Sequence, residues 1–225
     1  MSRILQTAVG CLIVLGVTAM SAGNVEQNTG WKVLFDGKAL DAWRVYKQPS
    51  VSAGWKIENG LLARVAAGGD LITKEQFGDF ELELDWKIAE GSNSGIFFRG
   101  TEESETIWHG APEMQILDNA RHADGKNPLT STGSNYAVHP PVRDVSRPIG
   151  EWNSVRLIAK GTHVEHWLNG VKVVDYELFS PDWDARVKKS KFVKYPQYGR
   201  APRGHIGLQD HGNPVWFRNI RIRPL

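Results

Sequence analysis

The segment 80–87, Phe-Glu-Leu-Glu-Leu-Asp-Trp-Lys, alternates apolar and charged residues at every position. Successive side chains of a β-strand point to opposite faces, so this period of two indicates a strand with one buried and one solvated face. Asn169-Gly170 is the strongest short hairpin signal in the chain. Similar patterns predict strands at 31–35, 55–57, 61–65, 80–87, 95–99, 113–117, 152–160, 162–168, 171–176, 205–209 and 215–223.

About ten short strands without βαβ alternation predict an all-β fold, an antiparallel β-sandwich. The 9 Trp and 23 Gly among 225 residues suit a β-rich chain with tight turns. One or two helical turns are expected after Ser180-Pro181, because Ser can cap a helix and Pro suits its first position. No repeat or linker divides the segment 30–225, so we predict one domain there.

The N-terminus has the pattern of an export signal. Arg3 gives a positive start, residues 8–17 are apolar and uncharged, and residues 18–23 are small and permissive for signal peptidase. We predict a signal peptide at 1–22, a linker at 23–29 and a secreted, periplasmic or cell-surface protein; an uncleaved anchor is the alternative. Cys11 is the only cysteine, so the mature chain would lack disulfides, which suits a bacterial periplasm or cell surface.

The charge balance excludes some partners. Lys and Arg number 27 and Asp and Glu 25, a formal net charge of +2. Nucleic acid is not expected as a partner, since a phosphate-binding surface needs a concentrated basic excess. No polybasic patch indicates membrane association beyond export. The basic run between Arg186 and Arg203 includes aromatic residues, a combination that could contact single-stranded nucleic acid. With a net charge near zero, we interpret it instead as a solvated flank beside a sugar site.

Two predicted loops, residues 100–112 and 119–150, are long for hairpin connections. Long loops in compact domains either bind ligands or are disordered. Several aromatic and basic residues favour binding: Trp108, His109, Tyr136, His139 and Arg143.

The predicted strand at 113–117 is chemically the richest. Glu113 and Gln115 share a face, about 6.6 Å apart along the chain, whereas Asp118 falls on the other face unless a bulge turns it back. The pattern resembles the Glu-x-Asp-x-(x)-Glu strand of laminarinase-like family 16 glycosidases, with Gln115 in place of the middle acid. This replacement argues against a retaining mechanism with two carboxylates. An edge strand with exposed polar residues is the non-functional alternative.

Two other predicted strands carry polar groups in the same register. Asn93 and Arg99 share one face of the first, and Gln209 and His211 share one face of the second. If the apolar opposite faces fill the core, these side chains converge with Glu113 on one concave surface. Such a combination suits a polyol. For His211 alone, the alternative is a loop-end histidine bonded to backbone.

No cofactor is predicted. A divalent metal site is an alternative that five residues could form: His109, Glu113, Asp118, His205 and His211. No closely spaced pair such as His-x-x-x-His supports it. We expect His163, His166 and His205 to have structural roles.

Seven short motifs follow one another over nearly the whole chain from residue 30. They are residues 30–37, 93–96, 113–118, 150–153, 166–170, 207–212 and 217–220. Together they resemble the 3-keto-disaccharide hydrolase domain family. The resemblance implies a concanavalin A-like jelly roll, similar to that of family 16 glycosidases, in an exported bacterial protein acting on glycosides whose C3 hydroxyl is oxidised to a ketone. It also implies a sugar oxidoreductase acting upstream as a partner.

A ketone at C3 changes what cleavage requires. It acidifies the hydrogen on C2, so a base can remove that hydrogen, and the enolate can then expel the C1 substituent by β-elimination. Water can add to the resulting enone. The route needs a base, a group beside the enolate oxygen and an acid for the leaving oxygen. We assign Glu113 or His211 as base, Arg99 or a bound cation beside the enolate, and Asp118 as acid or orienting group.

Other residues are assigned to substrate binding. The amides of Asn93, Gln115 and Gln209 would hold the sugar hydroxyls. The ring of Trp108 or Tyr136 would stack on the sugar, and His109 would also contact it. The alternative function is a lectin-like module that binds carbohydrate without cleaving it, because the same sandwich serves both purposes.

Overall fold

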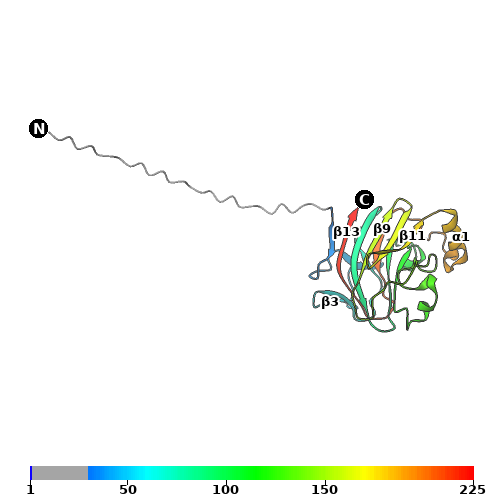
Figure 1. The fold of residues 1–225 in the computed structure, drawn as a ribbon, viewed down its shortest axis with the longest axis horizontal. Coiled ribbons are helices and arrows are strands. Elements are labelled where there is room, and N and C mark those ends of the chain that lie inside the picture. Colours follow the sequence, from blue (N-terminus) through cyan, green and yellow to red (C-terminus); the bar gives the residue numbers. More distant parts are fainter. Residues whose placement is uncertain (2–29) are drawn as a thin grey trace.

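Two antiparallel β-sheets pack face to face around the hydrophobic core (Figure 1). This computed structural model describes residues 30–225, together with Met1. Apart from Met1, the predicted signal peptide at 1–22 and linker at 23–29 therefore lie outside the described residues. Within the described part, no helix has the length and apolar character needed to cross a membrane.

The larger sheet has eight strands. They are β1 (Lys32–Phe35), β3 (Trp55–Glu58), β4 (Leu61–Arg64), β6 (Phe80–Ile88), β9 (Asn153–Lys160), β10 (His163–Leu168), β11 (Val171–Glu177) and β13 (Val215–Pro224). Their order is β11-β10-β9-β6-β13-β4-β3, and β1 also pairs with β13.

The smaller sheet has five strands in the order β2-β5-β12-β7-β8. They are β2 (Trp43–Val45), β5 (Leu71–Thr73), β7 (Asn93–Gly100), β8 (Glu113–Leu117) and β12 (His205–Leu208). All pairings in both sheets are antiparallel, so the predicted all-β sandwich is confirmed. Every predicted strand is present within one or two residues, whereas β2 and β5 were not predicted.

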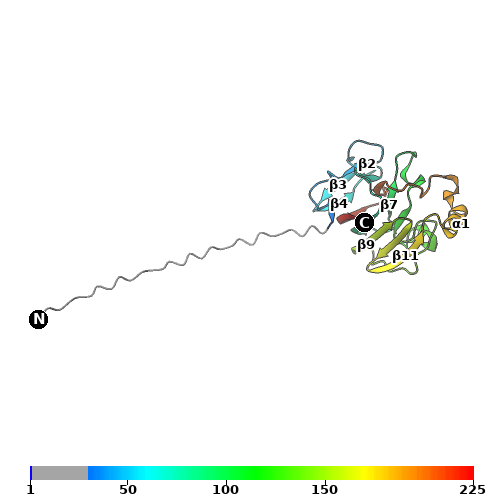
Figure 2. The same ribbon diagram turned by 90° about the horizontal axis from the view of Figure 1, so that it is seen from above.

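The helices are short. Among residues 30–225 there is one α-helix, α1 (Pro181–Lys189), and it begins where it was predicted. The Ser180 hydroxyl caps it by accepting a hydrogen bond from the Trp183 N–H at 3.1 Å. Four 3₁₀-helices complete the described part: η1 (Ile107–His109), η2 (Ala123–Lys126), η3 (Pro128–Thr130) and η4 (Lys191–Lys194). Figure 2 shows α1 at the end of the sandwich near β11, away from β3 and β4.

Strand alternation separates the core from the free face of the smaller sheet. In β7, Ile96 and Phe98 belong to the core between the sheets, where the Phe98 ring meets Phe80 of β6 edge-on with centroids 6.4 Å apart. Phe97 points the other way, into a second apolar cluster that also contains Ile72. This second cluster supports the free face of the five-stranded sheet, where the candidate site lies.

Candidate functional site

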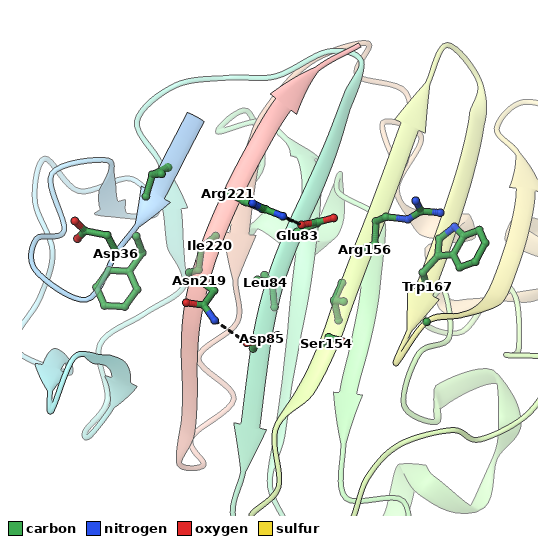
Figure 3. A pocket seen from close by; sticks show the side chains of 14 residues that line it. Asp36, Glu83, Leu84, Asp85, Ser154, Arg156, Trp167, Asn219, Ile220 and Arg221 are labelled. Carbon is green, nitrogen blue, oxygen red and sulfur yellow. Dashed lines mark hydrogen bonds and ion pairs between the residues drawn. The ribbon is translucent and has the colours of Figure 1, made fainter. Parts of the chain in front are cut away.

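A hollow of about 870 Å³ lies over the outer face of the eight-stranded sheet, but its polar groups satisfy one another (Figure 3). Glu83 pairs with Arg221 at 2.6 Å, and Asp85 accepts a hydrogen bond from Asn219 at 2.8 Å. Arg156 covers the Trp167 ring at 4.2 Å. These pairs leave few free polar groups, so we do not assign the active site here.

A smaller hollow, of about 240 Å³, lies on the free face of the five-stranded sheet. Eight residues line it: Asn93, Trp108, Glu113, Gln115, Tyr136, Lys191, Gln209 and His211. The structure thus brings together seven residues that were selected from the sequence, and it adds Lys191. The seven come from β7, β8, the 3₁₀-helix 107–109, the segment after β12 and the loop between β8 and β9. We take this hollow as the candidate active site.

Glu113 is the central ionisable group of the site. Its side chain is only 5% exposed and leans over Gly95 on the neighbouring strand β7, where any Cβ atom would overlap its carboxyl oxygen. Burial raises the pKa of Glu113 to about 8. Lys191 opposes this shift, while the charges of Asp70 and Asp124 add to it. Such a group can exchange a proton near neutral pH.

Three amide oxygens in the cavity lack a donor. Asn93 Oδ1, Gln115 Oε1 and Gln209 Oε1 are buried, and no residue in the described part of the chain donates a hydrogen bond to them. The Gln115 amide is oriented by its own Nε2, which donates to the Thr130 carbonyl at 3.3 Å. A buried acceptor without a donor lowers the stability of the fold unless a ligand or a water molecule donates a hydrogen bond to it. Sugar hydroxyls are donors of this kind.

Lys191 supplies the positive charge at the mouth of the cavity. It lies on η4, with its Nζ 4.4 Å from the Tyr136 ring centroid and 4.7 Å from that of Trp108. Partial desolvation lowers its pKa, although Glu113 and Asp124 oppose this. Lys191 belongs to the basic run from Arg186 that is predicted to flank the site, but it is not itself one of the predicted site residues.

A column of stacked aromatic rings holds η4 in place. Phe192, next to Lys191, stacks on Tyr198 with centroids 3.8 Å apart, and Tyr198 stacks on Trp183 of α1 at 5.7 Å. Trp183 stacks in turn on Tyr176 of β11 at 5.5 Å. All four rings are buried, so the sandwich core fixes the segment that carries the cation.

His109 and His211 occupy different positions. His109 does not line the cavity; its ring stacks on Tyr195 at 4.0 Å and meets Trp108 edge-on at 4.2 Å. It therefore supports Trp108 from behind. His211 is exposed at the rim, where its ring meets that of His122 with centroids 5.9 Å apart.

Arg99 does not share the face of Glu113, so that prediction is wrong. Its backbone adopts a left-handed φ of 50°, and the pairing of β7 with β12 shifts register there. Both interrupt the strand alternation on which the prediction rested. The guanidinium instead donates to the carbonyls of Gly78 and Gly161 at 3.0 and 2.9 Å and pairs with Asp79 at 3.0 Å.

Asp118 also lies away from the cavity. Strands β7 and β8 pair without a register shift, so the bulge that would have turned Asp118 back is absent. Its buried carboxylate instead accepts hydrogen bonds from the backbone N–H groups of Gly91 at 2.8 Å and Ala120 at 3.1 Å. Asp118 therefore holds two loops together, and its predicted role as acid is not supported by this placement.

The five residues considered for a metal are not brought together as a set. Asp118 is engaged as described, and His205 Nδ1 lies 2.6 Å from the Thr73 carbonyl. Within residues 30–225, the group with metal-like spacing is His163, Glu165 and Asp175, on the outer face of the larger sheet. Lys172 already pairs with both of those carboxylates. His166 is buried with Nδ1 3.2 Å from the Gly133 carbonyl, as a structural histidine would be.

Comparison with known proteins places the chain in a family. Residues 30–223 match the 3-keto-alpha-glucoside-1,2-lyase-like domain. The chain belongs to this family. It is 38% identical over 229 residues to the 3-keto-disaccharide hydrolase of Bacteroides thetaiotaomicron, an alignment that covers 87% of this chain and 79% of that protein. The family predicted from the seven motifs is therefore confirmed.

Solved structures share the fold. One classed with the glycosyl hydrolases, from Parabacteroides distasonis, is 33% identical with a TM-score of 0.82, covering 87% of this chain and 94% of its own. The carbohydrate-binding module CBM66 of Bacillus subtilis is 13% identical with a TM-score of 0.51, covering 81% and 95%. The second likeness concerns the fold alone, and it agrees with the predicted β-sandwich.

Proposed function

We propose that this protein cleaves the glycosidic bond of 3-keto-glycosides, including 3-keto-disaccharides, by removing the C2 proton. The observation that carries the proposal is the buried Glu113 carboxyl group facing three amide oxygens without donors in one cavity. Family membership supports the substrate class, because the matched family is named for 3-keto-α-glucosides and the relative from B. thetaiotaomicron for 3-keto-disaccharides.

Glu113 is the base in this proposal. A carboxylate with a pKa near 8 is a stronger proton acceptor than an ordinary glutamate, as abstraction from carbon requires. Lys191 takes the place that the sequence analysis gave to Arg99, since its ammonium faces Glu113 and can stabilise an enolate oxygen at C3. His211, at the rim of the same cavity, is the second candidate for the base.

The remaining lining residues bind the sugar. The oxygens of Asn93, Gln115 and Gln209 accept hydrogen bonds from ring hydroxyls. Trp108 and Tyr136 provide half-buried aromatic walls for the apolar face of the ring. A ketone contributes no donor, so a cation beside C3 fits it better than another amide oxygen would.

The substrate sets the place of this reaction in a sequence. A 3-keto-glycoside arises when a sugar oxidoreductase oxidises the C3 hydroxyl, so such an enzyme acts upstream. The apolar segment within residues 1–22 supports export, and the cleavage then takes place in the periplasm, at the cell surface or outside the cell.

One experiment separates the enzyme from a lectin. The mature chain is incubated with 4-nitrophenyl 3-keto-α-glucoside and with the unoxidised glucoside, and nitrophenolate release is followed. We expect release from the keto form alone. Release from both would instead indicate a conventional glycosidase, and binding of either sugar without release would indicate the carbohydrate-binding alternative.

A further inference from the structure

The proposed reaction still needs an acid for the leaving oxygen, because Asp118 lies away from the cavity. Asp70 is a carboxyl group on the free face of the five-stranded sheet. It directly precedes β5 and by alternation shares the side of Ile72, whose side chain belongs to the apolar cluster supporting the site. Asp70 is not among the site residues predicted from the sequence.

Asp70 lies outside the eight residues that line the cavity, but it is next to Gln209, which does line it. The pairing of β12 with β5 joins Leu208 to Leu71, so the next position along places Gln209 opposite Asp70. On its other side, the Gln209 N–H donates to the Gly95 carbonyl at 2.9 Å, and the Glu113 carboxyl lies over Gly95. Two interstrand steps, roughly 10 Å in total, therefore separate Gly95 from Asp70. That span accommodates one sugar ring.

One oxygen of Asp70 is held and the other is free. Its Oδ1 accepts a hydrogen bond from the Asp210 N–H at 2.8 Å, and within residues 30–225 no group hydrogen-bonds to Oδ2. Burial, together with the charge of Asp210, raises the pKa of Asp70 to about 6. The charge of Asp70 in turn raises the pKa of Glu113, so the two carboxyl groups lie within electrostatic reach.

Lys191, Glu113 and Asp70 lie across the sheet in the same order as the atoms of the sugar on which they would act. Lys191 packs over Tyr136, whose backbone N–H donates to the Glu113 carbonyl at the outer edge of β8. The Glu113 carboxyl comes next, over β7, and Asp70 lies two strands further. Across a bound sugar this order corresponds to the C3 ketone, the C2 hydrogen and the oxygen on C1.

From this arrangement, and resting on the proposed function, we propose that Asp70 is the acid that protonates the glycosidic oxygen leaving C1. In the first half, Glu113 takes the C2 proton, the C1–O bond breaks, the C1–C2 double bond forms and Asp70 gives its proton to the departing oxygen. In the second half, water adds its hydroxyl to C1, Asp70 takes the remaining water proton and Glu113 returns a proton to C2. The cycle starts with Glu113 ionised and Asp70 protonated, which is the less populated arrangement of the one proton that the two groups hold between about pH 6 and 8. Both carboxyl groups regain these states at the end.

Asp70→Asn tests this assignment, because the amide keeps an oxygen for the Asp210 N–H but cannot donate an acidic proton. Two substrates are compared: a 3-keto-disaccharide, whose alkoxide leaving group needs a proton, and 4-nitrophenyl 3-keto-α-glucoside, whose phenolate does not. We expect the variant to lose about 100-fold or more in kcat/KM on the disaccharide. On the nitrophenyl substrate the loss should be less than about threefold.

Asp124→Asn is the matched control, since Asp124 also raises the pKa of Glu113 but is bound by the Tyr136 hydroxyl at 3.2 Å. Its effect should be similar on both substrates. Equal losses for Asp70→Asn on both substrates, or a disaccharide-specific loss in Asp124→Asn or His211→Gln, would overturn the assignment to Asp70. Wild-type protein inactive on both substrates would instead overturn the proposed function. Thermal unfolding of each variant verifies that it is folded.

Discussion

Gly95 lies directly beneath the Glu113 carboxyl group, and a side chain of any size at residue 95 would occupy the space of that carboxyl. The two residues lie on adjacent strands, β7 and β8, two positions out of direct register, because Gly95 pairs with Gln115 and Glu113 with Phe97. Glycine at this point is therefore what lets the carboxyl lean over the strand toward Gln209 and the cavity.

Gly95→Ala should displace Glu113 and impair catalysis. We expect kcat/KM to fall by about 100-fold through misplacement of the base, and the protein to lose about 1–3 kcal/mol of stability through overpacking. Gly78→Ala is the matched control, because a Cβ there meets its nearest atom at an ordinary 3.6 Å. Steady-state kinetics and urea unfolding measure both effects. Unchanged kinetics in Gly95→Ala would remove Glu113 from the mechanism.

If Glu113 is the base, the activity should rise with pH. Only the ionised carboxylate accepts a proton, so kcat/KM for the nitrophenyl substrate should increase toward pH 8 and level off above it. A limb that falls as pH rises through 8 would show instead that Glu113 acts as an acid.

The same group links pH to stability. The pKa of Glu113 is raised in the folded protein, so its contribution is fully present below the unfolded pKa, near 4.5, and is lost as pH rises through about 8. Glu113→Gln removes the ionisation and keeps the shape. We expect the variant to gain stability relative to wild type as pH increases from 5 to 9, in paired urea titrations; a constant difference would contradict the burial of the charge.

Lys191→Met should slow the reaction and shift its pH profile. Loss of the cation beside the enolate is expected to lower kcat by about 10²–10³-fold. Since Lys191 lowers the pKa of Glu113, the rising limb should also move to higher pH. Lys191→Arg keeps the charge and should restore the position of the limb. A limb unmoved in Lys191→Met would mean that the ammonium does not act on Glu113.

Trp183→Leu should affect both stability and rate, because Trp183 stacks between Tyr198 and Tyr176 in the aromatic column. Truncating a fully buried large ring costs about 3–5 kcal/mol when the residue becomes Ala and somewhat less for Leu. The folded variant should also lose kcat/KM, since η4 and Lys191 depend on the column. Normal kinetics in the folded variant would show that Lys191 is positioned by other contacts.

Arg99→Met should destabilise the fold without changing the chemistry. The substitution removes the hydrogen bonds to the Gly78 and Gly161 carbonyls and the ion pair with the partly exposed Asp79 carboxylate, at a cost of about 1–3 kcal/mol. Under conditions where the variant is folded, its kcat/KM should match that of wild type. A specific loss of kcat would restore Arg99 to the catalytic set.

The sequence was sufficient for the long strands and for most of the cavity lining. The alternation in β6, and the shared face of Glu113 and Gln115, follow from the period of two that a regular strand imposes. Alternation failed at Arg99 because a single left-handed residue at a register shift reverses the direction of the side chain.

The residues missed by the sequence analysis depend on long-range packing. Lys191 is brought to Glu113 by a ring column that links α1, η4 and β11, and no local pattern encodes such a contact. Asp70 precedes β5, a strand of three residues that is too short to show periodicity. Both residues become visible only when sheet order and side-chain packing are known.

A kinetic isotope effect at C2 tests the central claim most directly. A 3-keto-glucoside carrying deuterium at C2 and its unlabelled form are each incubated with wild-type protein and with Glu113→Gln, and aglycone release is followed. The account predicts that wild type cleaves the labelled substrate more slowly than the unlabelled one, and that Glu113→Gln cleaves neither. Equal rates of cleavage of the two substrates by wild type, or unimpaired cleavage by Glu113→Gln, would contradict abstraction at C2 by Glu113.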